Sequence, residues 1–175
     1  MGVKIQIRFS KGRLPRHAEC NEIISRAFNS AHLPSTLEPR GIARSDGKRP
    51  DGMTLVPWFR GQCVVWDFTC VDSLPRSRTG IPSHAATEAE KRKVLKYSET
   101  SRSHIFTPIA CCTLGSWGEA SLKFLRALGK RLISTSGDRR AGCFLRQRLS
   151  VAIARGNATS ILSGMQPKCR LNLPY

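Results

Sequence analysis

Acidic residues are scarce in this chain. Only 12 aspartates and glutamates stand against 29 lysines and arginines among 175 residues, so the formal net charge is +17 at pH 7. The basic side chains are spread along the whole sequence and are not gathered in one tail, which predicts a broad surface that follows a polyanion. We expect that partner to be nucleic acid, and an anionic membrane surface is the alternative.

Long apolar runs and zinc-binding patterns are lacking too. No segment approaches the roughly 20 apolar residues of a membrane-spanning helix, and no secretory signal pattern is found, so we expect an intracellular protein with no membrane partner. The seven cysteines form no Cys-x-x-Cys pair, and the four histidines are not spaced as their co-ligands. The pattern therefore predicts reduced thiols and no structural zinc.

Two aspartates stand at mirrored distances from a predicted chain reversal. Residues 52–56 and 63–69 are rich in β-forming side chains, and a turn glycine lies between them, so the pattern predicts a β-hairpin. If the reversal is centred near Phe59, Asp51 and Asp67 lie directly opposite each other, on one face and about 4.5–5.5 Å apart. A register that is off by one residue would put the two carboxylates on opposite faces instead.

Two facing carboxylates suggest a cation between them. Like charges opposite each other destabilise a strand pair unless a proton or a cation lies between them. Mg²⁺ accepts one or two carboxylates and completes its shell with water and phosphate oxygens. The hairpin therefore predicts that Asp51 and Asp67 hold Mg²⁺, with Mn²⁺ as the alternative ion.

The first half of the chain offers two further acids. Helical periodicity predicts a first helix over 17–31, and on its polar face Glu22 is spaced to pair with Arg26. Glu22 is interpreted as a salt-bridged surface residue, and the alternative is an additional acid at the metal site. Residues 36–38 have the pattern of a short strand, which makes Glu38 the second candidate.

A basic cluster lies on the helix predicted over 84–99. Lys93, Lys96 and Tyr97 are spaced i, i+3 and i+4, so they share one face of that helix. From composition alone, such a lysine cluster is a solvated surface.

The remaining elements follow from periodicity and capping signals. Pro108 predicts an edge strand or a bulge. Ser116 and Glu119 have the spacing of a capping box, and Asp138 is expected to cap the last helix. The expected elements are a strand over 104–112, a helix over 116–133, and a last helix after Asp138 whose pattern weakens beyond 156.

The order of these elements resembles the PD-(D/E)XK nuclease fold, the architecture of many restriction enzymes. Pro50-Asp51 matches the Pro-Asp half of the motif, and Asp67 matches the second acid. The lysine of the motif is replaced by Thr69. One branch carries this lysine on the following helix, where Lys93-Val94-Leu95-Lys96-Tyr97 stands here.

That branch is the restriction-like endonuclease domain at the C-terminus of site-specific non-LTR retrotransposons, and this chain is similar to it. Arg16-His17 with Asn21 and the segment 113–118 also resemble retrotransposon-derived sequence downstream of reverse transcriptase. The resemblance implies an α/β (α+β) fold with a mixed central sheet flanked by helices and extra C-terminal helices. The expected limits are an irregular leader over 1–15, the nuclease-like domain over 16–162 and an irregular tail over 163–175.

The resemblance also implies an activity, the nicking of one DNA strand in the nucleus. Asp51, Asp67 and the backbone carbonyl of Phe68 would bind the metal ion, and Lys93 or Lys96 would orient water or neutralise charge on the phosphate. Tyr97 would hydrogen-bond in the same site or serve as a core residue. RNA stays open as the substrate, and a basic nucleic-acid-binding remnant without catalysis is the alternative function. The expected nucleic-acid contacts are Arg16, Lys48, Arg49, Arg76 and Arg78.

Overall fold

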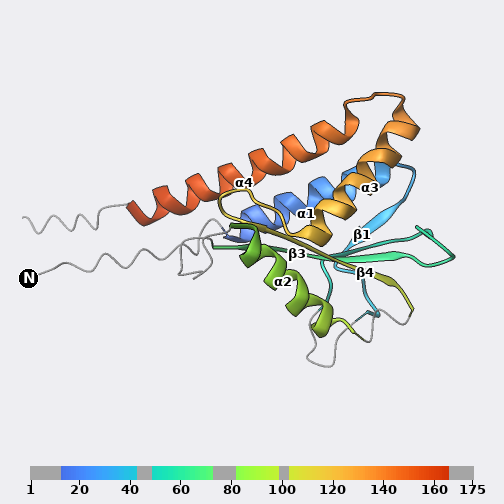
Figure 1. Ribbon diagram of the computed structural model, residues 1–175, viewed down its shortest axis with the longest axis horizontal. Helices are drawn as coiled ribbons and strands as arrows, with labels where there is room; N and C mark the ends of the chain where they lie inside the picture. The colour runs from blue at the N-terminus through green and yellow to red at the C-terminus, as the bar shows by residue number, and fades with distance from the viewer. Residues whose placement is uncertain (1–12, 43–48, 73–81, 99–102, 166–175) are drawn as a thin grey trace, which may run out of the picture.

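A mixed sheet flanked by helices forms the structure, a computed structural model that describes residues 13–42, 49–72, 82–98 and 103–165 (Figure 1). This architecture confirms the predicted mixed α/β fold at that coarse level. No helix in these ranges is both long and apolar enough to cross a bilayer. In chain order the elements are α1 (Arg13–Ser30), β1 (Ser35–Leu37), β2 (Gly52–Thr54), β3 (Val64–Val71), α2 (Pro82–Lys96), β4 (Ile105–Cys112), α3 (Glu119–Ser136) and α4 (Ala141–Met165).

The sheet has the strand order β1-β2-β3-β4. The β1·β2 and β2·β3 pairs are antiparallel, whereas β3 and β4 run parallel and are connected through α2. A parallel pair needs such a crossover because a tight turn can join only antiparallel neighbours. Strand β4 lies at an edge of the sheet, as Pro108 predicts, because proline cannot donate to a neighbouring strand.

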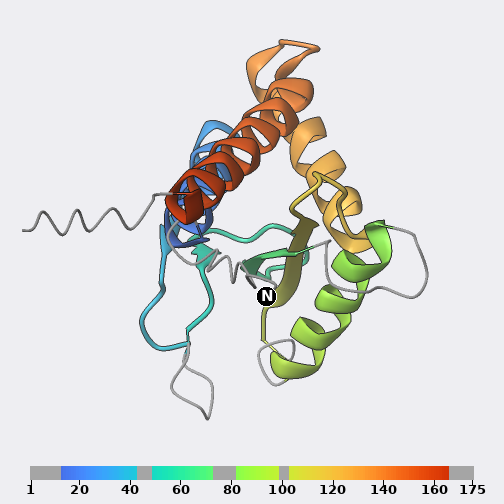
Figure 2. The same cartoon turned by 90° about the vertical axis from the view of Figure 1, so that its left-hand side faces the viewer.

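The helices form unequal layers on the two faces of the sheet. Helices α1 and α3 cover one face of the sheet, and α4 packs across these two helices. Helix α2 lies on the opposite face (Figure 1, Figure 2). The larger hydrophobic core lies under α1, α3 and α4, where Phe28 stacks on Trp66 with ring centroids 5.1 Å apart. A small alanine contact, Ala86 and Ala89 against Ala110, joins α2 to β4.

Strand β3 passes through the middle of this arrangement and sorts its side chains by alternation. Val64, Trp66 and Phe68 belong to the larger core under α1 and α3. Successive side chains of a strand point to opposite faces, so Asp67 is directed to the face that α2 covers. The single acid of this strand is thereby buried, with 7% exposure, beneath a helix that carries lysines.

The hairpin between β2 and β3 is confirmed, although its turn lies one residue later than expected. Gly52 pairs with Trp66 and Met53 with Val65, so each pair is symmetric about residue 59, as predicted. The reversal itself is at Arg60 and Gly61, which have φ of 48° and 76°. Two left-handed residues are typical of the tight hairpin turn. The first arm of the hairpin contains extra residues in the irregular stretch 55–58. The turn therefore lies after residue 59, although the ladder pairs are symmetric about that residue.

Several helix boundaries differ from the predicted ones. Helix α1 begins at Arg13, so residues 13–15 are not part of an irregular leader. Helix α4 continues to Met165, so residues 163–165 do not belong to an irregular tail. The glycine at position 156 suggested that the last helix weakens there. Instead, Gly156 allows α4 to pack closely against α1, because a Cβ added at Gly156 would lie 2.5 Å from the Cβ of Arg16.

The capping box predicted for α3 is wrong. The N-cap is Gly118, and no capping side chain within the helix start binds the free amides. Instead Glu90 of α2, which is 4% exposed, accepts hydrogen bonds from the amides of Ala120 at 3.1 Å and Ser121 at 2.8 Å and from the Ser121 hydroxyl. A residue far away in sequence thus satisfies the first turn, which local spacing cannot reveal.

Replacing Glu90 with alanine is expected to destabilise the fold by about 2–3 kcal/mol, because two amides and a hydroxyl lose their buried acceptor. The matched variant Ser116→Ala, which removes the residue of the predicted box, should change the free energy of unfolding by less than about 0.5 kcal/mol. Urea denaturation of both variants measures the difference. Equal losses in the two variants would contradict this cap assignment.

Candidate active site

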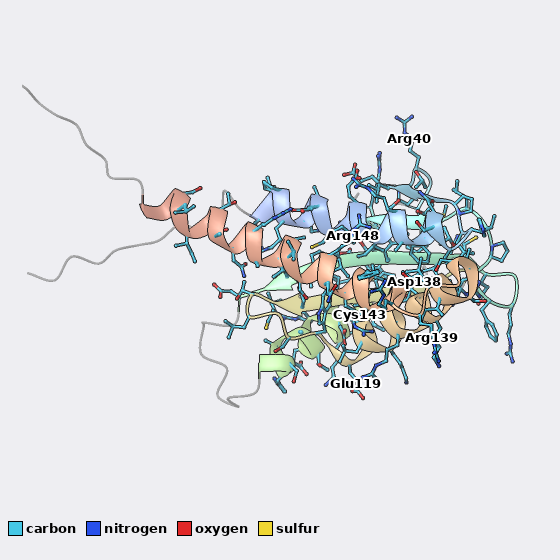
Figure 3. All side chains as sticks on the ribbon, turned by 90° about the horizontal axis from the view of Figure 1, so that it is seen from above. Arg40, Glu119, Asp138, Arg139, Cys143 and Arg148 are labelled. Carbon is cyan, nitrogen blue, oxygen red and sulfur yellow. The ribbon has the colours of Figure 1, made fainter. Side chains whose placement is uncertain are left out.

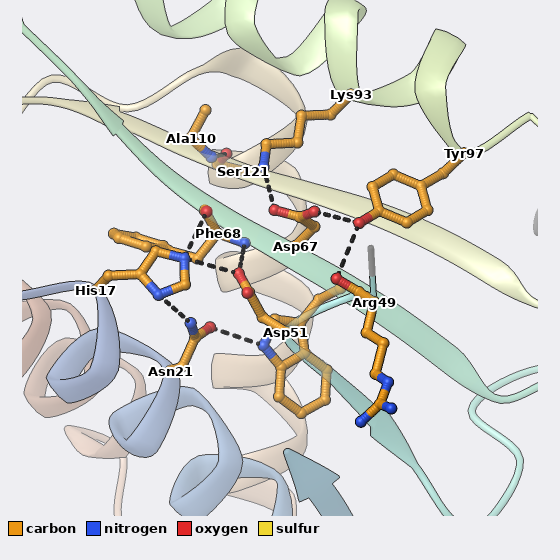
Figure 4. A network of polar contacts seen from close by, with 11 residues as sticks. His17, Asn21, Arg49, Asp51, Asp67, Phe68, Lys93, Tyr97, Ala110 and Ser121 are labelled. Carbon is orange, nitrogen blue, oxygen red and sulfur yellow. Dashed lines mark hydrogen bonds and ion pairs between the residues drawn. The ribbon is translucent and has the colours of Figure 1, made fainter. Parts of the chain in front are cut away.

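Asp67 is held from above by α2. Its Oδ2 accepts a hydrogen bond from the Tyr97 hydroxyl at 2.6 Å, and its Oδ1 forms an ion pair with Lys93 Nζ (Figure 4). The Lys93 side chain is 23% exposed, so the pair is partly shielded from water. Tyr97 is fixed by a stack on Phe106 with centroids 4.4 Å apart. Both carboxylate oxygens of Asp67 are therefore oriented by neighbouring side chains.

Of the three residues predicted to share one helix face, Lys93, Lys96 and Tyr97, the structure brings two to Asp67. Lys93 and Tyr97 are four residues apart and both contact the carboxylate, whereas Lys96 is exposed. Helix α2 ends at Lys96, so Tyr97 is placed by the turn that follows the helix. Of the two lysines that the sequence left open, Lys93 is the one that contacts Asp67.

Asp51 lies at the point where the β2·β3 ladder ends. The last ladder pair is Gly52 with Trp66, and the Asp51 amide donates to the same Trp66 carbonyl at 3.0 Å, so the ladder does not extend to a pair of Asp51 with Asp67. Beyond this pair Phe68 N–H has no backbone partner in β2 and donates to Asp51 Oδ2 at 2.6 Å. The Asp51 carboxylate therefore accepts the hydrogen bond that a backbone carbonyl of a neighbouring strand would otherwise accept, and it lies beside β3.

His17 of α1 closes the site from the other side. Its Nε2 lies 3.1 Å from Asp51 Oδ2 and 3.2 Å from the carbonyl oxygen of Phe68 (Figure 4). Two oxygens, one from a side chain and one from the backbone, thus converge on a single donor position. In the sequence, His17 is only part of the motif that carries the family resemblance, and no role was predicted for it.

A chain of hydrogen bonds fixes which nitrogen of His17 carries the proton. Trp66 Nε1, which can only donate, lies 3.1 Å from Asn21 Oδ1 and thereby orients the amide. Asn21 Nδ2 then donates to His17 Nδ1 at 3.2 Å. With Nδ1 as an acceptor, the neutral imidazole carries its hydrogen on Nε2 and donates it toward Asp51 and Phe68.

Opposing influences act on the charge of His17. The hydrogen bond to Asp51 raises the pKa of His17 above its ordinary value, and partial burial of the ring works in the opposite direction. The Asn21 amide also resists a second proton, since Nδ1 cannot accept this hydrogen bond and carry a proton at once. Asp51 and Asn21 therefore act in opposite senses on the same ring.

The donor set fits a hard divalent cation. Asp51 Oδ2 and the Phe68 carbonyl oxygen already converge on the N–H of His17, and Asp67 directly precedes Phe68 on β3. Mg²⁺ needs only one or two carboxylates, with water and phosphate oxygens in the other positions. In the part of the chain that the structure describes, no three side chains of His, Cys, Asp and Glu form a metal-binding cluster. Water or a phosphate group would have to complete the shell.

No protein-family model and no curated protein matches this chain. The described residues form a mixed α/β fold, with a four-stranded sheet and helices on both faces. The nuclease resemblance stays an expectation based on sequence motifs.

The remaining predicted acids lie apart from this centre. Glu22 pairs with Arg26 at 2.8 Å and is 48% exposed, which is the surface role that its spacing favours. The Glu38 side chain is exposed, although its backbone amide donates to the Asp51 carbonyl at 2.9 Å. Neither carboxylate has a recorded contact with the centre.

The residues predicted to contact nucleic acid differ in their exposure, and some lie outside the described residues. Arg49 is exposed beside Asp51, and its carbonyl oxygen lies 3.3 Å from the Tyr97 hydroxyl. Arg16 is only 5% exposed and lines a cavity at the start of α1. Exposed arginines that carry the positive surface include Arg40, Arg139 and Arg148 (Figure 3). Lys48, Arg76 and Arg78 lie outside the described residues.

Proposed function

We propose that this protein is a metal-dependent DNA endonuclease that nicks one strand and derives from a retrotransposon polyprotein, within a restriction-endonuclease-like PD-(D/E)XK fold. The observation that supports this most is that the Asp51 carboxylate accepts from the amide of Phe68, the residue next to Asp67 on β3, while the Phe68 carbonyl oxygen and Asp51 Oδ2 face the same nitrogen of His17. A lysine from α2 reaches the same centre. Carboxylates, a carbonyl and an ammonium together are the groups that phosphodiester hydrolysis with a metal ion requires.

Each residue of the centre has a distinct task in this proposal. Asp51, Asp67 and the Phe68 carbonyl would hold Mg²⁺ or Mn²⁺, and a bound ion of this kind polarises the phosphate and lowers the pKa of water. Tyr97 orients Asp67 through the bond to Oδ2. Lys93 supplies a positioned positive charge that can balance charge growing on the phosphate oxygens.

The substrate is inferred from charge and from the family resemblance. A net charge of +17 supports binding along a phosphate backbone, with an affinity that falls steeply as salt rises. In the retrotransposon parent, the nicked strand would offer a free 3′ end to prime reverse transcription. DNA as substrate places the protein in the nucleus, and RNA is the competing substrate to be tested.

A second candidate function is a nucleic-acid-binding remnant without catalysis. One observation favours it: both carboxylate oxygens of Asp67 and Oδ2 of Asp51 already have partners within the chain, namely Lys93, Tyr97, His17 and the Phe68 amide. An ion pair in place of a metal site would keep the fold and the charge while losing the chemistry. Such a protein would bind DNA with a strong salt dependence and no metal requirement.

Incubation with supercoiled plasmid separates the two functions. The endonuclease converts supercoiled plasmid to nicked circles in Mg²⁺ or Mn²⁺, and EDTA abolishes the conversion. The same assay on a labelled RNA of matched sequence decides between the two substrates. Plasmid binding without nicking at any metal or pH would overturn the proposed activity in favour of the remnant.

Substituting Lys93 with methionine is expected to lower the nicking rate about 100-fold, because the positioned charge is lost at the phosphate. Lys96→Met removes an equal charge from an exposed position three residues away and should keep the rate within about threefold. Thermal melts of both variants control for folding. A larger loss from Lys96→Met than from Lys93→Met would show that the wrong lysine has been assigned.

A further inference from the structure

A second site is suggested by a cavity of about 320 Å³ at the start of α1. Its walls come from the first turn of α1, from the last third of α4 and from the residues that follow β3 and β4. Pockets that bind small ligands begin near this size and combine an apolar lining with a few fixed polar groups. The residues used below are Arg13, Arg16, Asp72, Leu114, Asn157 and Ile161, all of which line it.

Arg16 is the fixed polar group. Its guanidinium is buried and donates from Nη1 to Asn157 Oδ1, while Asn157 Nδ2 donates to the Thr113 carbonyl at 2.6 Å. The Thr113 contact sets the orientation of the amide, so Asn157 turns its oxygen to the arginine. Gly156 leaves room for the Arg16 stem, since an added Cβ would collide with it.

Within the described residues, no ion pair with an acid balances the charge of Arg16. Among the ion pairs recorded for the described ranges, none involves Arg16. A buried guanidinium without a partner anion is costly. None of its nitrogens is both fully buried and without a hydrogen bond, and Arg16 lines the cavity. An anion in this cavity would give the guanidinium a partner of opposite charge.

A second arginine, Arg13, and one acid, Asp72, also line the cavity. Arg13 is one helical turn before Arg16, so both side chains project from the same side of α1. The N-terminus of α1 adds its partial positive charge at the same place. Asp72 is exposed, and its Oδ1 lies 3.4 Å from the Thr113 hydroxyl. The two arginines outnumber this carboxylate, so the cavity wall keeps a net positive charge.

Two large apolar side chains of the lining are open to solvent. Leu114 is 68% exposed and Ile161 is 49% exposed, and both border the cavity. Large apolar side chains around a positive pocket are unusual for a simple anion site and match a ligand that is charged at one end and flat and apolar at the other. A nucleotide has this form.

We propose that the cavity is a second nucleic-acid subsite that binds one nucleotide of the substrate, with its phosphate on Arg16 and Arg13 and its sugar and base against Leu114 and Ile161. The proposal rests on nucleic acid as the partner in the proposed function. Asp72, at the cavity, lies five residues after Asp67, which corresponds to about 16 Å along an extended strand. This span equals about five base pairs of duplex. The subsite would therefore hold a substrate strand away from the scissile phosphate.

Calorimetric titration of the full chain with thymidine 5′-monophosphate in EDTA tests this subsite without any catalysis. We expect one binding site in the wild type and an affinity at least about tenfold lower in Arg13→Gln and in Leu114→Asp. Val151→Asp, which adds the same charge at an exposed apolar position of α4, should bind as the wild type does. Arg16→Gln is a further variant, but the test does not depend on its folding.

Three results would overturn the subsite. The first is no binding of the nucleotide by the wild type, and the second is equal loss in Leu114→Asp and Val151→Asp. The third is inorganic phosphate binding as tightly as the nucleotide, which would reduce the cavity to a simple anion site. Because EDTA removes metal ions, nucleotide binding together with failed plasmid nicking would reject the endonuclease alone. Nicking without nucleotide binding would reject the subsite alone.

Discussion

Replacing Asp67 with asparagine is expected to lower the rate of Mg²⁺-dependent plasmid nicking at least about a thousandfold, the loss seen when a central electrostatic group of an active site is removed. Asparagine keeps the size of the side chain and can still accept from Tyr97, so the fold should be retained. What disappears is the negative charge that pairs with Lys93 and would bind the cation. Single-turnover nicking measures the effect.

The control for Asp67→Asn is Glu119→Gln, which removes one negative charge from an exposed position at the start of α3. Its nicking rate should stay within about twofold of the wild type, because surface charges are screened by salt. Asp67→Asn activity above a tenth of the wild-type rate would show that the buried carboxylate is not part of the reacting centre.

The substitution Gly52→Ala is expected to destabilise the protein by about 3 kcal/mol or more, through overpacking in the core. A Cβ at this position would lie 2.1 Å from the Trp66 indole, whose ring is fully buried under α1 and α3. The ring cannot move without breaking its bond to Asn21 or its stack on Phe28. Urea denaturation monitored by tryptophan fluorescence gives the free energy of unfolding.

A double substitution isolates this clash from other effects of alanine. Trp66→Phe shortens the ring system that Gly52→Ala would strike, so the two changes together should cost at least about 1 kcal/mol less than the sum of the separate changes. If the double variant shows the full sum of losses, the damage arises from the strand and not from contact with the indole.

The strand register next to the aspartates was predictable because strand pairing has a simple geometry. Alternation and the expected turn sufficed to pair Gly52 with Trp66 and Met53 with Val65, although the turn itself is at Arg60 and Gly61 and the ladder stops before Asp51. The extra residues in the first arm compensate for this shift. Their number is set by packing of the irregular arm against the core, which a local pattern does not encode.

The partners of these aspartates were only partly predictable. Lys93 and Tyr97 followed from helical spacing, but spacing alone also admitted Lys96, because the rotation of α2 over the sheet is decided by packing. The link from Trp66 through Asn21 to His17 joins strand β3 to two successive turns of α1. Its only local signal is the i, i+4 spacing of His17 and Asn21. Glu90 gave no signal at all, since its partners are about 30 residues away.

The most direct test of the account is a titration with Mn²⁺ followed by electron paramagnetic resonance, because the central claim is that Asp51 and Asp67 share one divalent cation. The account predicts one site in the wild type, an affinity at least about tenfold lower in Asp51→Asn and in Asp67→Asn, and no change in Glu119→Gln. Equal Mn²⁺ affinity in all four proteins would contradict it and would leave the paired carboxylates as a structural contact with Lys93 and His17.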